Sequence, residues 1–181
     1  GKQLQLAYNF AYLLGQKGKS IIALGTKRQA REHIETSAQA HGLHYITSRW
    51  LGGLLTNWNQ VKKSLKRMLT IQEGLQTDKY KGYTKYERVQ LEKEMGRLER
   101  FFIGIKSLKG VPDALFVVDP VREKNAVLEA AKCGIPVIAV CDTNADPDDI
   151  SLVIPANDDA QKSIQYLVEF VTAGYEAGKK S

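Results

Sequence analysis

Residues 20–30, reading SIIALGTKRQA, contain the unit that decides the fold of this chain. The run Ile21–Leu24 is apolar throughout, which is typical of a strand buried on both faces. The loop Gly25–Lys27 follows, and an apolar face at helical spacing then extends from Ala30 to Ala38. The segment therefore predicts a buried strand that passes through a short loop into an amphipathic helix.

The same unit recurs on both sides of this segment. A helix with an apolar face from Leu4 to Leu14 precedes it and ends near Gly18, and the short strand His44–Ile46 follows Gly42. Further apolar runs at 114–118, 137–141 and 152–154 are expected to be strands, with helices at about 121–133 and 160–171. Because parallel neighbours need a helical crossover, this alternation predicts a doubly wound α/β domain with a parallel five-stranded sheet in the flavodoxin-like order 2-1-3-4-5.

Residues 61–108 interrupt this repeat, since they have helix periodicity without a strand. Two apolar seams flank the helix breakers at 74–84, one made of Val61, Leu65, Met68 and Leu75 and the other of Leu91, Met95, Leu98, Phe102 and Ile105. They predict an antiparallel helical hairpin at 58–108, inserted into a sheet domain made of residues 1–57 and 109–181. A helix of roughly 20 residues would project about 30 Å. The base of the hairpin could pack on the sheet, but we expect its seams to contact mainly each other and the arm to be separable.

The segment 49–58, reading RWLGGLLTNW, joins the predicted sheet to the hairpin. Gly52 and Gly53 permit positive φ and are expected to form a turn whose backbone geometry side chains would obstruct, and Asn57 with Gln60 is typical of a capping pair that opens a helix. The planar guanidinium of Arg49 suits phosphate. The ring of Trp50 either packs on the core or is available to a partner.

Charge is distributed unevenly within a net of +6. Residues 1–110 carry 20 Lys and Arg against 8 Asp and Glu, whereas residues 111–181 carry 6 against 12. A one-sided basic excess favours a polyanionic partner such as RNA, although exposed helices are often charged and some arm residues are expected to pair with Glu87, Glu92, Glu94 and Glu99. Three tyrosines near the hairpin turn, Tyr80, Tyr83 and Tyr86, could stack on exposed bases. The candidate RNA-binding residues are Lys27, Arg28, Arg49, Trp50, Lys62, Lys63, Lys66, Arg67, Lys79, Lys81, Lys85 and Arg88.

Evidence for catalysis is weak. Asp119, Asp142, Thr143 and Asn144 follow predicted strands, and an alternative hypothesis makes Asp119 and Asp142 the site of a phosphate- or Mg²⁺-dependent α/β enzyme. The first strand, however, ends without an acid, so capping and turn formation are the simpler roles, as they are for Asp158 and Asp159 before the final helix. No catalytic residue, metal, cofactor or small-molecule substrate is predicted.

Other sequence features also argue for a simple binding protein. The two cysteines, Cys133 and Cys141, have neither disulfide nor zinc-site context and are expected to be buried thiols. The three histidines, His33, His41 and His44, are expected to be structural. No apolar run suits a membrane span or an export signal, so no membrane partner is predicted.

Several blocks of the sequence resemble the small-subunit ribosomal protein S2 family, in its bacterial and organellar branch. They are residues 49–58, 25–30, 112–120, 134–136, 142–147 and 154–160. The resemblance implies a non-catalytic component of the small ribosomal subunit that binds ribosomal RNA and neighbouring ribosomal proteins at the junction of head and body and helps to recruit the messenger-binding protein S1. It also implies a ribosomal location, in bacterial cytoplasm or plastid stroma, and a clamp made of Lys27, Arg28 and Arg49 opposite the basic arm.

Overall fold

The computed structural model describes residues 1–142 and 148–181. Its five strands are β1 (Ile21–Leu24), β2 (His44–Ile46), β3 (Ala114–Val118), β4 (Val137–Cys141) and β5 (Leu152–Pro155). They form one parallel sheet in the order β2-β1-β3-β4-β5, which confirms the predicted fold class and strand order. Thr143 and Asn144, which were expected to form a turn, lie outside the described residues.

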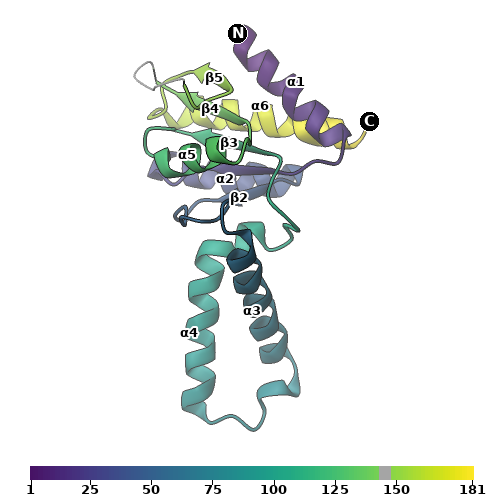
Figure 1. The fold of residues 1–181 in the computed structure, drawn as a ribbon, viewed down its shortest axis with the longest axis vertical. Helices are drawn as coiled ribbons and strands as arrows, with labels where there is room; N and C mark the ends of the chain where they lie inside the picture. Colours follow the sequence, from purple (N-terminus) through teal and green to yellow (C-terminus); the bar gives the residue numbers. More distant parts are fainter. Residues whose placement is uncertain (143–147) are drawn as a thin grey trace.

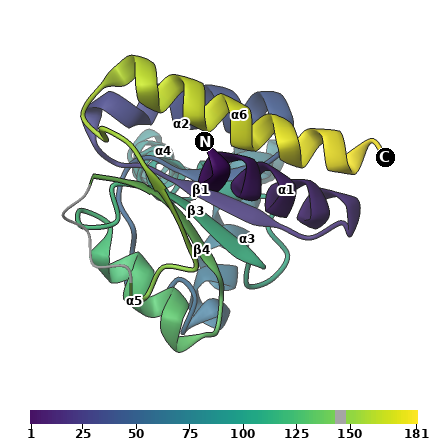
Figure 2. The same cartoon turned by 90° about the horizontal axis from the view of Figure 1, so that it is seen from above.

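Helices cover both faces of the sheet because the strands are apolar on both sides. Helices α1 (Lys2–Gln16), α2 (Arg28–His41) and α6 (Gln161–Lys179) lie on one face, and α5 (Lys124–Lys132) lies on the other (Figures 1 and 2). Side chains alternate accordingly, since Phe116 belongs to the first apolar cluster and its neighbours Leu115 and Val117 belong to the second.

The predicted hairpin consists of α3 (Trp58–Gln76) and α4 (Lys85–Phe102), which extend together away from the sheet (Figure 1). A 3₁₀ turn at Asp78–Tyr80 lies between them, and a second at Ile103–Ile105 follows α4. Helix α4 opens with a capping box, in which Thr84 Oγ1 accepts from Glu87 N at 3.1 Å and Glu87 Oε2 accepts from Thr84 N at 2.9 Å. At about 1.5 Å per residue, α3 alone reaches about 28 Å.

The base of the arm belongs to the core of the sheet domain. Val61, Leu65, Met68 and Phe102 lie in the same apolar cluster as Leu115 and other inward residues of the sheet. A separate cluster further out contains Ile71, Tyr80 and Leu91. The expectation that the seam residues contact mainly each other is therefore wrong for the base and holds for the outer half, because the second face of the sheet needs an apolar cover.

Two smaller expectations concern the cysteines and the membrane. Cys141 is buried in β4 but Cys133 is exposed after α5, so the prediction of two buried thiols is wrong for Cys133. Within the described ranges, every helix is too short or too polar to cross a bilayer.

Candidate nucleic-acid interface

The loop that carries the arm is held by one buried carboxylate, that of Glu129 on α5. Its Oε2 accepts from Trp50 Nε1 at 3.0 Å and from Gly53 N at 3.2 Å. Its Oε1 accepts from Leu55 N at 2.7 Å, and from Thr56 N at 3.0 Å and Thr56 Oγ1 at 3.2 Å. Burial alone would raise the pKa of Glu129, but these donors lower it below its ordinary value, so the carboxylate stays charged.

Trp50 is therefore part of the core rather than an exposed ring, and its assignment as an RNA-binding residue stays a prediction. Its side chain is 7% exposed, and Glu129 satisfies its one polar hydrogen. Sequence reasoning missed Glu129 itself. The available signal was a single carboxylate on the apolar face of α5, beside Ala126 and Ala130 at helical spacing.

The Gly-Gly turn and the expected cap differ partly from prediction. Gly53 has φ +93°, as expected, whereas Gly52 lacks a positive φ and has open space where a Cβ would lie. Asn57 is the N-cap of α3, but its side chain makes no capping hydrogen bond, so the predicted capping pair with Gln60 is wrong. The hydrogen bonds that Glu129 accepts from the loop hold this junction instead.

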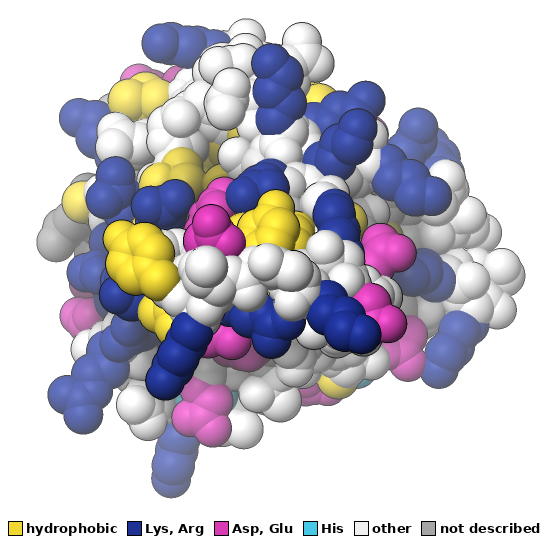
Figure 3. All heavy atoms as spheres, turned by 90° about the horizontal axis from the view of Figure 1, so that it is seen from below, with side chains coloured by type: hydrophobic (Ala, Val, Ile, Leu, Met, Phe, Trp, Pro, Cys, Tyr) yellow, Lys and Arg dark blue, Asp and Glu magenta, His cyan; other side chains and the backbone are white. Residues whose placement is uncertain are grey.

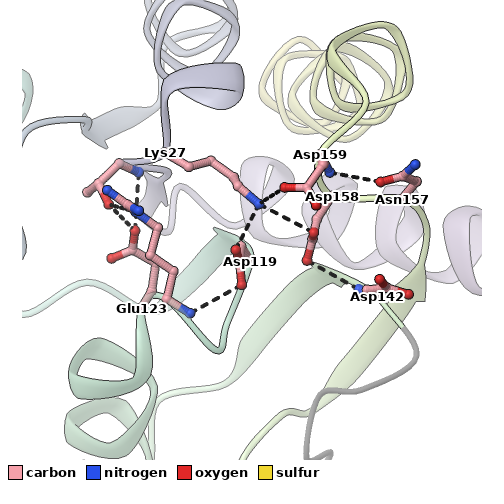
Figure 4. A network of polar contacts seen from close by, with 9 residues as sticks. Lys27, Asp119, Glu123, Asp142, Asn157, Asp158 and Asp159 are labelled. Carbon is pink, nitrogen blue, oxygen red and sulfur yellow. Dashed lines mark hydrogen bonds and ion pairs between the residues drawn. The ribbon is translucent and has the colours of Figure 1, made fainter.

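Lys27 is enclosed by three carboxylates rather than presented to a partner (Figure 4). Its Nζ lies 2.8 Å from Asp119, 2.8 Å from Asp159 and 3.3 Å from Asp158, and the residue is 6% exposed. Burial lowers its pKa, but the hydrogen bonds to Asp119 and Asp159 outweigh that effect and raise it. This arrangement corrects the assignment of Lys27 to RNA, since its charge already joins β1, β3 and the approach to α6.

The same cluster explains the acids that the enzyme hypothesis required. Asp119 has φ +65°, binds Lys27 through Oδ2, and accepts from Arg122 N at 3.2 Å through Oδ1. Asp158 accepts from Asp142 N at 3.3 Å, and neither Asp158 nor Asp159 caps α6, whose N-cap is Ala160. The expected capping of α6 is therefore wrong, whereas both acids do lie in a turn, as expected. The ammonium of Lys27 takes the central position that a metal would need, so the cluster is better explained as an internal ion-pair network.

The arm presents most of its cationic side chains to solvent. Seen from its tip, the surface carries more Lys and Arg than Asp and Glu (Figure 3). The exposed candidates on the arm are Lys62, Lys63, Lys66, Arg67, Lys79, Lys81, Lys85 and Arg88, and Arg28 and Arg49 are exposed on the sheet domain.

Three arm residues have internal contacts that change their expected roles. Arg67 forms a bidentate pair with Glu94, at 2.8 and 3.0 Å, as the expected pairing within the hairpin allowed. Arg88 donates to the carbonyl oxygens of Tyr80 and Lys81, both at 3.2 Å, and so holds the turn together. Tyr80 is 5% exposed and packs against Gly74, which corrects its expected place among the exposed rings, whereas Tyr83 and Tyr86 are exposed.

The fold and this surface together define an α/β protein that carries a basic helical arm. The family model described as "Ribosomal protein S2" matches residues 1–178. The chain therefore belongs to the ribosomal protein S2 family. It is a protein of the small ribosomal subunit, and the role of this family is structural rather than enzymatic.

Proposed function

We propose that the chain binds small-subunit ribosomal RNA through the exposed basic side chains of its arm, with Arg28 and Arg49 as contacts on the sheet domain. The observation that supports this most strongly is the exposure of six lysines along α3, the turn and the start of α4, namely Lys62, Lys63, Lys66, Lys79, Lys81 and Lys85. Lysines in contact with phosphates release condensed counterions, which gives sequence-independent affinity that falls with salt.

The geometry of the arm favours distributed contact over a single binding pocket. Its tip lies far from the sheet and has its own small apolar cluster around Tyr80, so it keeps its shape without a partner. The exposed rings of Tyr83 and Tyr86 beside these lysines could stack on unpaired bases. Arg67 and Arg88 contribute less in this proposal, because Glu94 and the turn carbonyls already use their donors.

The finer role follows from the family. We propose that the protein bridges the head and body of the subunit and contributes to the docking of protein S1, in a ribosome of the bacterial or plastid type. Membership of the ribosomal protein S2 family supports this.

Reconstitution with small subunits that lack this protein tests the proposal. Purified chain should co-sediment with them at low salt, and the logarithm of its affinity should fall linearly with the logarithm of salt concentration. Salt-independent association would contradict electrostatic RNA binding. Mg²⁺-dependent turnover of a phosphorylated substrate that Asp119→Asn abolished would instead support the enzyme hypothesis.

A further inference from the structure

A cavity of about 420 Å³ opens at the carboxyl edge of the sheet, away from the outer arm. Its walls come from Thr26 after β1, Ser48 and Arg49 after β2, and Arg122 after β3. In a doubly wound sheet, the carboxyl ends of the strands beside the reversal in strand order are where ligands bind. The last turn of α4 adds Arg100 from the arm.

Three arginines from three separate segments line this cavity, namely Arg49, Arg100 and Arg122. Thr26 holds one of them in place, because Arg122 Nε donates to Thr26 Oγ1 at 3.0 Å and leaves the terminal nitrogens of the guanidinium for a ligand. Planar guanidinium groups that meet in a cavity match the geometry of phosphate oxygens.

One carboxylate, that of Glu123, also lines the cavity, and its charge opposes an anion. It accepts hydrogen bonds from the backbone N–H and the hydroxyl of Thr26, and is 5% exposed. Burial raises the pKa of Glu123 above its ordinary value despite those bonds. Three arginines against one restrained carboxylate leave the cavity positively charged.

Neutral groups in the wall also favour an anion. Asn125 and Ala126 lie in the first turn of α5, where the helix N-terminus carries partial positive charge and the side chain of the N-cap residue Glu123 makes no capping hydrogen bond. The hydroxyl of Ser48 is covered from solvent and lacks a hydrogen-bond partner within the described part of the chain. A ligand would therefore meet Ser48 through its other atoms, which line the cavity.

We propose that this cavity binds the phosphate group of a nucleotide, either free or within an RNA chain. Its volume is in the range of small-molecule sites and exceeds what phosphate alone would fill. The inference does not depend on the arm lysines, which lie outside the cavity, but it shares Arg49 with the proposed RNA contacts of the sheet domain.

Calorimetry and amide chemical shifts of the isolated full chain at low salt test this proposal. The probes are adenosine 5′-monophosphate, adenosine without phosphate, and an unstructured RNA of about ten nucleotides, a length that one single-strand site can cover. Arg49→Gln and Arg100→Gln should each weaken binding of the monophosphate about tenfold, as expected when a bidentate hydrogen-bonded pair with phosphate is removed. Arg97→Gln is the matched control, since it removes the same charge one turn earlier on α4 and lies outside the cavity lining.

The expected result is monophosphate binding with shifts at Ser48 and Asn125, no measurable adenosine binding, and little effect of Arg97→Gln. If the RNA displaces the monophosphate, the natural ligand is an RNA nucleotide, and if it does not, the ligand is a free nucleotide. Equal weakening by Arg97→Gln, equal affinity for adenosine, or no shift at Ser48 and Asn125 with either phosphate probe would overturn the proposal. Co-sedimentation of a variant with Lys62, Lys63 and Lys66 changed to Ala, which leaves the cavity lining unchanged, reports on the arm separately.

Discussion

The indole Nε1 of Trp50 donates a 3.0 Å hydrogen bond to Glu129 Oε2, and the two residues are 79 positions apart in the sequence. This bond and four others join the loop before α3 to helix α5. That loop leads directly into the arm. The direction of the arm therefore depends on the buried carboxylate of Glu129 on α5.

Glu129→Gln should destabilise the protein by about 2–4 kcal/mol, because the new amide NH₂ would face backbone or indole donors and leave them unpaired. Urea unfolding at neutral pH measures this, with exposed Glu92→Gln on α4 as the control. The folded pKa of Glu129 is lowered, so its contribution is present above the unfolded pKa of about 4.3 and is lost as pH falls through the folded value. A destabilisation below about 0.5 kcal/mol, the usual size of a surface substitution, would contradict this role.

Gly53→Ala should cost about 1–2 kcal/mol, because φ +93° is strained for any residue with a Cβ. Gly52→Ala is the control. A Cβ at Gly52 would meet nothing within 4 Å, and the backbone of Gly52 does not have a positive φ. Thermal unfolding of the two variants compares them directly. Equal destabilisation by the two changes would show that the turn rearranges rather than stores strain.

His41→Gln should destabilise the protein more at about pH 6 than at about pH 9. Burial lowers the pKa of His41, but Glu169 and Glu176, each 2.7 Å away, outweigh it and raise the pKa. Protonated His41 therefore stabilises the fold fully below the unfolded pKa of about 6.5, and this contribution is lost as pH rises through the folded value.

Unfolding free energies of wild type and His41→Gln at the two pH values measure this effect. His44 has a lowered pKa because of burial and the charge of Lys179, and its opposite contribution cancels in the comparison. If His41→Gln lowered the free energy of unfolding equally at both pH values, a charged His41 would not contribute to the packing of α2 against α6.

Sequence patterns predicted the sheet because each strand is an uninterrupted apolar run and each crossover carries a helical face. The heptad-like spacing predicted the hairpin in the same way. What periodicity could not predict was the partner of each seam. Met68 and Leu91 both belong to seams with heptad-like spacing. Met68 packs in the apolar cluster under the sheet, whereas Leu91 packs in the outer cluster of the arm.

Residue-level predictions at the interface were weaker because they depend on contacts between distant segments. Lys27 lies in a loop that suits phosphate, but its carboxylate partners Asp158 and Asp159 are 131 and 132 residues away in sequence. Sequence position does not distinguish Tyr80 from Tyr83 and Tyr86 either, because the conformation of the turn decides that the Tyr80 ring packs against Gly74. The exposure of the arm lysines does not depend on contacts with distant segments. Their assignment to RNA therefore stays a proposal.

Replacing Lys62, Lys63 and Lys66 with Ala should weaken subunit binding and reduce the salt slope by about one unit for each phosphate that is no longer neutralised. Arg67 is left unchanged because Glu94 already pairs with it. A variant with Lys2, Lys17 and Lys162 replaced removes the same charge from exposed positions on α1, at its C-cap and on α6, on the sheet face away from the arm. Equal slopes in the two variants would mean that α3 does not contact phosphate.

Shortening the arm tests its role as the main RNA clamp most directly. Replacing residues 70–92 with a Gly/Ser linker of about six residues, enough to cross the roughly 10 Å between packed helices, keeps Met68 in the core and retains the Arg67–Glu94 pair. Removing the whole arm would instead expose the second face of the sheet and is expected to prevent cooperative folding.

The decisive measurement is the incorporation of this shortened chain into small subunits that lack the protein, in competition with the full-length chain. A full-length variant with Lys79, Lys81 and Lys85 changed to Gln separates the effect of charge from that of shape. We predict that the shortened chain unfolds cooperatively but loses most of its stable association, and that the charge variant loses part of it. A cooperatively folded short chain that incorporates as well as the full-length protein would contradict the arm as the main RNA clamp and move that role to the sheet domain.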